Sequence, residues 1–213
     1  MHSLLFVDTE TNCFAEEIGA DTWKRPHYED DGSVIYPRIS QISWIITKTD
    51  GEVRVSRDFI IKPNGYEISA NATSVHGITN EYANEVGVPI EKVISLLIKD
   101  FIEYNCYKIC GHNVKFDIHM IEAEALRLKL IGFYHKLVES HFEDTCTNSK
   151  VMHYVGGLDK RGRIKKPRLS ELYMKIFGKE FEGAHNSMAD ITATKECYFE
   201  LVTMGLIDQM VID

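Results

Sequence analysis

An apolar segment near the start of the chain ends in two carboxylates. Residues Leu4–Val7 are apolar, and Asp8 and Glu10 follow with Thr9 between them. If this segment is a β-strand, side chains two positions apart share a face, so both carboxylates point the same way. Two like charges on one face of a buried strand are unfavourable unless a cation lies between them. The pattern fits a divalent metal site with oxygen ligands, and a solvated strand end is the simpler alternative.

Two later segments place further polar side chains where helices are expected to begin. Asp117 falls in the first turn of a helix that Asn113 can cap, where the helix dipole also favours an anion. His185 and Asp190 are five positions apart, so on one continuous helix they would point about 140° apart. They converge only if His185 lies on the preceding loop and one of the next two residues is the N-cap. The alternative for a histidine in this position is an ordinary surface residue.

The elements that would position these residues follow a mixed α/β pattern. After the first strand, Ile39–Thr47 and Val53–Lys62 alternate in polarity around an Asp50-Gly51 hairpin turn, which predicts a three-stranded antiparallel meander. Tyr107–Cys110 is a further short strand. Helices are expected at 69–75, 79–85, 89–101, 113–130 (ended by Gly132), 144–155, 168–177 and 187–204. Strands alternating with helices after a meander predict an α/β fold with a central mixed sheet flanked by helices.

The length and composition of the chain fit one α/β domain over residues 1–213. The chain has 213 residues, of which 44% are hydrophobic and 26% are charged. No apolar run is long enough to span a membrane, and five cysteines without framework spacing indicate reduced thiols and a cytoplasmic location. The net charge of −8 does not exclude a nucleic-acid substrate, because bound metal ions invert the local field of an acidic site.

Two segments have compositions that suit nucleic-acid contacts but also have simpler explanations. An irregular insertion at about 13–38 is long for a compact domain, and such loops tend to be functional or disordered. Its aromatic residues, Trp23 and Tyr28, and the basic residues between them can bind bases and phosphates, or can equally pin the loop to the domain. The stretch 160–168 carries six basic residues and no acid, which fits either phosphate contacts or a solvated loop.

Four motifs together resemble those of the DnaQ-like, or DEDDh, 3′→5′ exonucleases. They occur in the order of that family and span Leu4 to about Leu201. They are Val7-Asp8-Thr9-Glu10-Thr11, Val75-His76-Gly77-Ile78-Thr79, His112-Asn113-Val114-Lys115-Phe116-Asp117 and His185-Asn186-Ser187-Met188-Ala189-Asp190. Each motif is weak alone, but four acids and one histidine at these spacings are specific as a set. The resemblance implies a ribonuclease H-like fold, with the metal site at the edge of the sheet.

The resemblance also implies roles for individual residues. It implies that His185 is the general base and that two Mg²⁺ or Mn²⁺ ions are bound by Asp8, Glu10, Asp117 and Asp190. Thr9, Thr11 and Asn12 would lie near the 3′-hydroxyl of the substrate, and His76 and Ile78 would contact its last bases. The remaining candidate substrate contacts are Asn113, Arg161, Arg163, Lys165, Lys166 and Arg168.

The function expected from these features is hydrolysis of single-stranded or frayed DNA from its 3′ end, releasing nucleoside 5′-monophosphates. An RNA 3′-end exonuclease with the same residues is the main alternative. A non-catalytic nucleic-acid-binding module on the same fold is disfavoured, because no acid and no histidine of the set is missing. A zinc site at Cys106, Cys110 and His112 is also disfavoured, because a structural zinc ion needs a fourth ligand.

Overall fold

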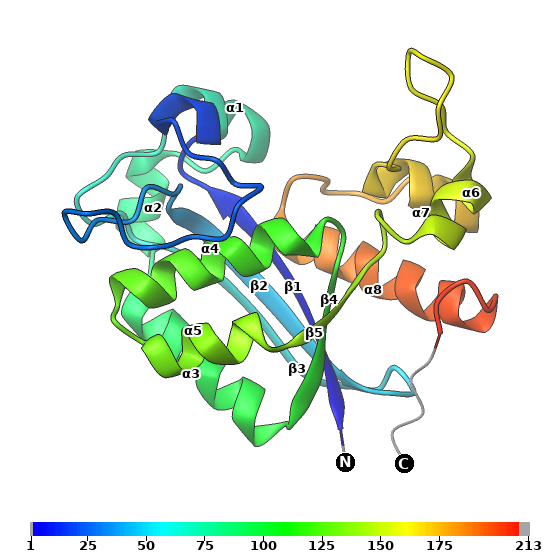
Figure 1. Ribbon diagram of the computed structural model, residues 1–213, viewed down its shortest axis with the longest axis horizontal. Coiled ribbons are helices and arrows are strands. Elements are labelled where there is room, and N and C mark those ends of the chain that lie inside the picture. The colour runs from blue at the N-terminus through cyan, green and yellow to red at the C-terminus, as the bar shows by residue number, and fades with distance from the viewer. Residues whose placement is uncertain (1, 209–213) are drawn as a thin grey trace.

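The computed structural model describes residues 2–208 and is built around a five-stranded sheet (Figure 1). The strands are β1 (Ser3–Thr11), β2 (Ile39–Lys48), β3 (Val53–Ile60), β4 (Cys106–Gly111) and β5 (His141–Asp144), in the spatial order β3-β2-β1-β4-β5. The β1–β2 and β2–β3 pairs are antiparallel, whereas β1–β4 and β4–β5 are parallel. The predicted antiparallel meander and mixed sheet are therefore confirmed.

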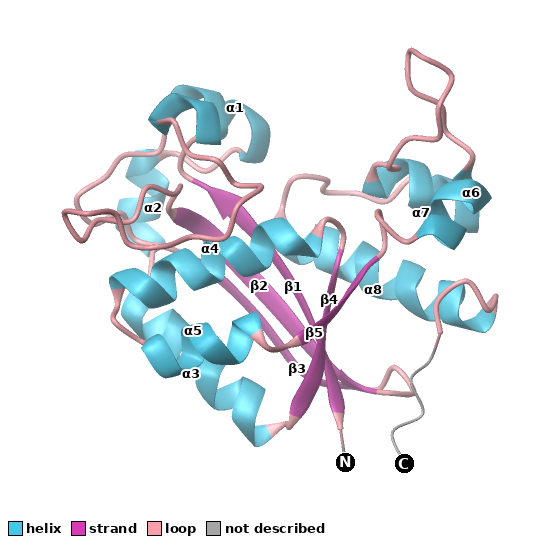
Figure 2. Ribbon diagram, in the orientation of Figure 1, coloured by secondary structure: helices cyan, strands magenta, loops and turns pink. Residues whose placement is uncertain are grey.

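The helices form a layer on each face of the sheet (Figures 1 and 2). Helices α3, α4 and α5 cover one face, and α8 lies across the other, with α6 and α7 beside it. The bounds are α1 (Ala70–His76), α2 (Asn80–Val86), α3 (Ile90–Glu103), α4 (Val114–Arg127), α5 (Ile131–Val138), α6 (Ser149–Val155), α7 (Leu169–Phe177) and α8 (Ser187–Thr203), with a 3₁₀ turn, η1, at Ala15–Ile18.

Alternation along β1 decides which layer each of its side chains meets. Leu5 and Val7 pack in the core shared with α3, α4 and α5, whereas Leu4 and Phe6 pack against α7 and α8. All four are buried, and each such side chain contributes about 1.5–3 kcal/mol to stability. A one-residue slip in register would exchange the two sets, so the register is strongly specified. The same alternation directs the odd-numbered residues at the end of β1 towards α4 and the even-numbered ones towards α8.

The end of β1 has a strand neighbour on only one side. Its pairing with β2 runs from Ser3 to Thr11, but its pairing with β4 covers only Ser3–Phe6. Beyond Phe6, the place of β4 is taken by the start of α4, whose Asp117 accepts hydrogen bonds from Thr9. The carboxylates of β1 therefore lie where side chains from both helical layers can approach the strand.

Two of the sequence predictions about elements were wrong. The helix expected to run to about Leu130 ends at Arg127, because Lys129 adopts a left-handed backbone conformation with φ of 58°. A separate helix, α5, then begins at Ile131 and includes Gly132, which was expected to be a stop. The start of the helix expected at 144–155 is instead the end of β5, an edge strand whose first two residues are exposed and which therefore lacks an apolar pattern.

The predicted loop at about 13–38 is fastened to α4 rather than loose. Arg38 binds Glu124 through Nε and Oε1 at 2.8 Å, and Arg25 Nε lies 3.1 Å from Glu122 Oε2. Both glutamates are at most 1% exposed. A buried carboxylate without a cationic partner is costly, so these arginines hold the loop in place.

The two aromatic residues singled out in this loop behave differently. The Tyr28 hydroxyl donates to the Leu126 carbonyl at 2.6 Å and so helps to anchor the loop, whereas Trp23 is 73% exposed. Anchoring therefore does not account for Trp23.

No helix within residues 2–208 is both long enough and apolar enough to cross a lipid bilayer.

Candidate active site

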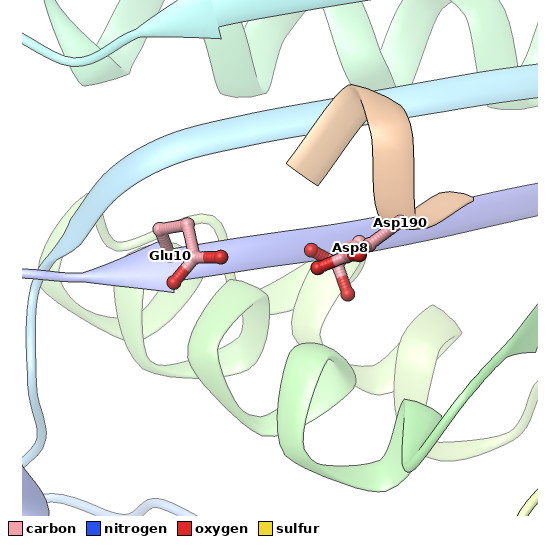
Figure 3. Close-up of side chains that lie close together, drawn as sticks. All are labelled: Asp8, Glu10 and Asp190. Carbon is pink, nitrogen blue, oxygen red and sulfur yellow. The ribbon is translucent and has the colours of Figure 1, made fainter. Parts of the chain in front are cut away.

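Three carboxylates meet between the end of β1 and the start of α8 (Figure 3). Asp8 and Glu10 come from the α8-facing side of β1, and Asp190 comes from the first turn of α8. One oxygen from each residue lies within 4.8 Å of the other two. The strand alternation that brings Asp8 and Glu10 together is the one predicted from sequence, and the packing of α8 on that face supplies the third acid.

The electrostatics of this cluster oppose its ionisation. Burial raises the pKa of Asp8 well above its usual range, and the neighbouring charges of Asp117, Asp190 and Glu10 raise it further. Burial, followed by repulsion from Asp190 and Asp117, raises the pKa of Glu10 to about 8. Burial also raises the pKa of Asp190. A bound cation would relieve this repulsion, and the ligand set of hard carboxylate oxygens suits Mg²⁺ or Mn²⁺.

Asp117 approaches β1 from the opposite face and lies outside the three-oxygen cluster. Its Oδ1 accepts hydrogen bonds from both the backbone N and the Oγ1 of Thr9, each at 2.8 Å. Burial raises the pKa of Asp117 to about 8, although the two bonds from Thr9 lower it. Asp117 is nevertheless the charge that perturbs Asp8 most strongly, so the two carboxylates are close neighbours.

The side chain of Thr9 therefore orients Asp117, and the position near the substrate 3′-hydroxyl that the resemblance implies for Thr9 stays a prediction. Thr9 is only 6% exposed. Replacing it with valine keeps the shape and removes the hydroxyl donor, so we expect activity to fall about 10- to 100-fold, as for other residues that orient metal ligands. The measurement is the initial rate as a function of Mg²⁺ concentration, with Thr203→Val at the exposed end of α8 as the control. Equal rates and equal metal dependence in both variants would contradict this role.

His185 lies on the loop before α8, as the spacing required. Its backbone is left-handed, with φ of 68°, and its N–H donates to Asp190 Oδ2 at 3.1 Å. Asn186 is the N-cap of α8, accepting a hydrogen bond from the backbone N of Ala189. The His185 side chain is exposed.

The side chains at and just beyond the C-terminal end of β1 make hydrogen bonds within the protein that the sequence did not predict. The side chain of Asn12 accepts from the backbone N of Arg38 at 2.7 Å and donates to the carbonyl of Glu67 at 3.0 Å. The hydroxyl of Thr11 donates to the Cys13 carbonyl at 3.1 Å. The Asn12 side chain therefore fastens the loops around the strand end, which was not anticipated because both partners are distant in sequence.

The side chains of His76 and Ile78, which were predicted to contact bases, also make contacts within the protein. His76 Nε2 lies 3.1 Å from the Thr11 carbonyl, and its Nδ1 lies 3.1 Å from the backbone N of Ile78. Burial lowers the pKa of His76, which favours the neutral ring. Ile78 is 5% exposed and packs with Ile68 and the nearby alanines of α1 and α2. Ile78 therefore packs in a small core cluster, and its contact with the substrate stays a prediction.

The basic residues of 160–168 lie on the loop between α6 and α7 and differ in their partners. Arg163 pairs with Asp159 at 2.8 Å, and Lys165 pairs with Glu171 at 2.6 Å. The ammonium of Lys166 lies 5.2 Å from the centre of the Trp23 ring. The side chains of Arg161 and Arg168 are exposed. Phosphate contacts from this loop remain a prediction.

Asp144 is a residue near the site that the sequence did not reveal. It is 6% exposed, and its Oδ1 accepts hydrogen bonds from the backbone N of Asn113 at 3.0 Å and of Cys146 at 2.9 Å. Asn113 has a left-handed backbone and an exposed side chain, and it does not cap α4 through that side chain. Asp144 ends β5, so without that strand its place beside α4 could not be predicted.

Comparison with known proteins identifies the family. The family model for exonucleases named RNase_T matches residues 5–198. The chain belongs to this exonuclease family. No curated protein matches the chain.

Solved structures confirm the ribonuclease H-like fold of this chain. E. coli Exonuclease I with a dA16 oligonucleotide is 21% identical with a TM-score of 0.71, covering 95% of this chain and 41% of that chain. The zinc-bound E. coli Exonuclease I complex with single-stranded DNA is 21% identical with a TM-score of 0.70, covering 96% and 41%. The complex with a dT13 oligonucleotide is 21% identical with a TM-score of 0.68, covering 95% and 41%. This chain thus spans about two fifths of the length of those proteins.

The raised pKa values predict how the stability of the metal-free protein depends on pH. The folded pKa of Glu10, about 8, lies above its usual value of 4.5, so the folded state binds more protons than the unfolded state between these values. The contribution of Glu10 to the free energy of unfolding is therefore fully present below about pH 4.5 and is lost as the pH rises through about 8. We expect the melting temperature in EDTA to be lower at about pH 9 than at about pH 6, and Mg²⁺ to reduce the difference. Glu10→Gln should flatten the dependence, and a melting temperature that rises with pH in EDTA would contradict the assignment.

Proposed function

We propose that this exonuclease removes nucleotides from the 3′ end of single-stranded DNA, with two Mg²⁺ or Mn²⁺ ions, and releases nucleoside 5′-monophosphates. The observation that carries the proposal is the cluster of Asp8, Glu10 and Asp190, with oxygens within 4.8 Å of one another and His185 on the adjoining loop. The similar fold of E. coli Exonuclease I, solved with dA16 and dT13, supports DNA as the substrate.

The acidic residues at the end of β1 fit a pair of divalent cations. Asp8 is the central acid of the four. Glu10 of β1 and Asp190 of α8 lie on the α8-facing side of β1, and Asp117 approaches from the α4-facing side. Asp8 would contact both ions, with Glu10 and Asp190 around one of them. Thr9 occupies Oδ1 of Asp117, which leaves Oδ2 for the second ion or its water. When bound, the ions would neutralise the phosphate, lower the pKa of the attacking water and stabilise the leaving oxygen.

The protein residues would contribute positioning and proton transfer. His185 would accept the proton of the attacking water, a step that requires its neutral ring. The hydrogen bond from the backbone N of His185 to Asp190 would couple the position of the base to that of a metal ligand. The backbone around Thr11 and Asn12, at the end of β1, would lie next to the 3′-hydroxyl.

An assay with 5′-labelled oligonucleotides tests the proposal. Single-stranded DNA, duplex DNA and RNA of one sequence are incubated with Mg²⁺ or Mn²⁺, and the products are resolved by length. We expect a ladder that shortens from the 3′ end, fastest on single-stranded DNA and absent in EDTA. Activity that survives chelation would overturn the metal mechanism, and faster shortening of RNA would overturn the choice of DNA.

A further inference from the structure

A cavity of about 220 Å³ lies beside the start of α4, and the proposed mechanism does not use it. Its walls come from segments that are far apart in the chain. Trp23 belongs to the loop at about 13–38, Lys115 and Phe116 to the first turn of α4, Phe142 to β5 and Lys166 to the loop between α6 and α7. The two loops that were predicted to contact nucleic acid thus meet at one place.

The cavity adjoins the active site. Phe116, in its wall, immediately precedes Asp117 on α4. Asp144 and Asn113 also line the cavity, and the backbone N of Asn113, directly before α4, donates to Asp144 Oδ1 at 3.0 Å. A molecule in the cavity would therefore be a neighbour of anything bound at the metal site.

The lining suits a flat, uncharged ring better than a phosphate. Three of the lining side chains, Trp23, Phe116 and Phe142, are aromatic and offer surfaces on which a base can stack. The carboxylate of Asp144 would repel a phosphate but can accept hydrogen bonds from the N–H groups of a base. The volume is smaller than the roughly 300–1,000 Å³ of pockets for drug-sized ligands, which suits one ring system.

The contact between Trp23 and Lys166 adds positive charge at the same place. The Lys166 ammonium lies 5.2 Å from the centre of the Trp23 ring, and the ring is part of a side chain that is 73% exposed. Such a cation–π contact between two loops holds both side chains at the cavity. An exposed tryptophan beside a lysine is the combination that binds a base together with its phosphate in single-stranded nucleic acids.

We propose that this cavity binds one unpaired nucleobase of the strand that enters the active site, stacked on Trp23, with a neighbouring phosphate at Lys166. The proposal rests on the proposed function, and it deepens it by giving a structural reason for a single-stranded substrate. A base held in the cavity cannot remain paired within a duplex, so strands must be separated before they occupy this site.

The fluorescence of Trp23 tests the proposal directly. Trp44, the other tryptophan, is 0% exposed, so acrylamide quenches mainly the 73% exposed Trp23. The full chain carrying Asp8→Asn is titrated with a short oligodeoxythymidine in EDTA, and binding is followed separately by anisotropy of a 5′ label. We expect bound DNA to protect Trp23 from acrylamide, and an abasic nucleotide at one position of the oligonucleotide to abolish the protection.

Substitutions then separate stacking from charge. Trp23→Leu is expected to weaken binding about 5- to 100-fold, as for the loss of one stacked base, and Trp23→Phe to retain most of the affinity. Lys166→Gln is expected to lower the dependence of log affinity on log salt by about 1, whereas Lys99→Gln on the exposed side of α3 leaves it unchanged.

Two results would overturn the proposal: unchanged acrylamide quenching when the DNA is fully bound, or equal affinity of Trp23→Leu and the parent protein. The ladder assay with the unmodified chain distinguishes this failure from failure of the proposed function. Shortening of DNA without protection of Trp23 would remove only the base site. Protection of Trp23 without any shortening would remove the exonuclease proposal and keep the base site.

Discussion

Replacement of Asp8 by asparagine is expected to reduce nucleotide release about 10³-fold or more. Asp8 is the acid whose pKa is raised by each of Glu10, Asp117 and Asp190, so it is the common neighbour of all the proposed metal ligands. Asparagine keeps the shape of the side chain but not the negative charge that a divalent cation requires. The measurement is the rate of shortening of a 5′-labelled single-stranded oligonucleotide at saturating Mg²⁺.

The same substitution is expected to stabilise the metal-free protein. Asparagine cannot ionise, so it removes both the burial cost and the repulsion that raise the pKa of Asp8. A gain of about 1 kcal/mol corresponds to about 2–4 °C in melting temperature for a chain of this size. Loss of activity combined with a gain in stability would separate a functional charge from a structural one.

Asp30→Asn is the matched control for both measurements. It makes the same change in charge at an exposed position of the loop, and it should alter neither rate nor melting temperature appreciably. Two outcomes would contradict the role of Asp8. One is chelator-sensitive activity within about tenfold of the parent, since a central metal ligand is worth far more. The other is a lower melting temperature in EDTA, which would mean that Asp8 stabilises the metal-free fold.

The part of the site that the sequence predicted depends on short-range geometry. Residues two apart on a strand share a face, and this alone placed Asp8 and Glu10 together. His185 and Asp190 converge because a helix cap separates them, and Asn186 provides that cap. In each case the relevant positions are within a few residues of one another, where backbone periodicity decides the direction of side chains.

The parts that were missed depend on partners distant in sequence. Thr9 and Asp117 are 108 positions apart, so no local pattern shows that the threonine holds the carboxylate. Ile78 is apolar whether it faces a base or a core, and only its packing places it in the core. Asp144 could not be placed because β5 is an edge strand with two exposed residues at its start.

Helix α4 contains two further residues whose surroundings depend on partners distant in sequence. Glu122 and Glu124 look like residues of a solvated face, yet both are buried. They are covered by the loop at about 13–38, whose Arg25 and Arg38 are distant from them in the chain. The loop was recognised from its length and irregularity, but its docking site was not, because buried ion pairs are defined only once both partners are in place.

Replacement of His185 is expected to lower kcat about 10²- to 10⁴-fold, as for the loss of a general base. Asparagine is the best choice, because it tolerates the left-handed backbone that His185 adopts. The hydrogen bond to Asp190 comes from the backbone N of His185, so the substitution leaves it in place and tests the ring alone. Mn²⁺ affinity should therefore be nearly unchanged, which distinguishes a base from a metal ligand.

The pH profile provides the decisive measurement for this residue. A general base must be neutral to accept a proton, so the rate of the parent protein should rise as the pH is increased from acidic values. The carboxyl groups of the metal site would produce a change in the same direction, because their raised pKa values disfavour the anions that bind cations. Measurement at saturating Mn²⁺ removes that contribution, since a bound cation keeps the carboxylates ionised.

At saturating Mn²⁺, the His185→Asn variant should lose the rise of rate with pH, and His153→Asn on the exposed face of α6 should keep it. A His185→Asn enzyme with the parent rate and the parent profile would show that the proton of the water leaves by another route.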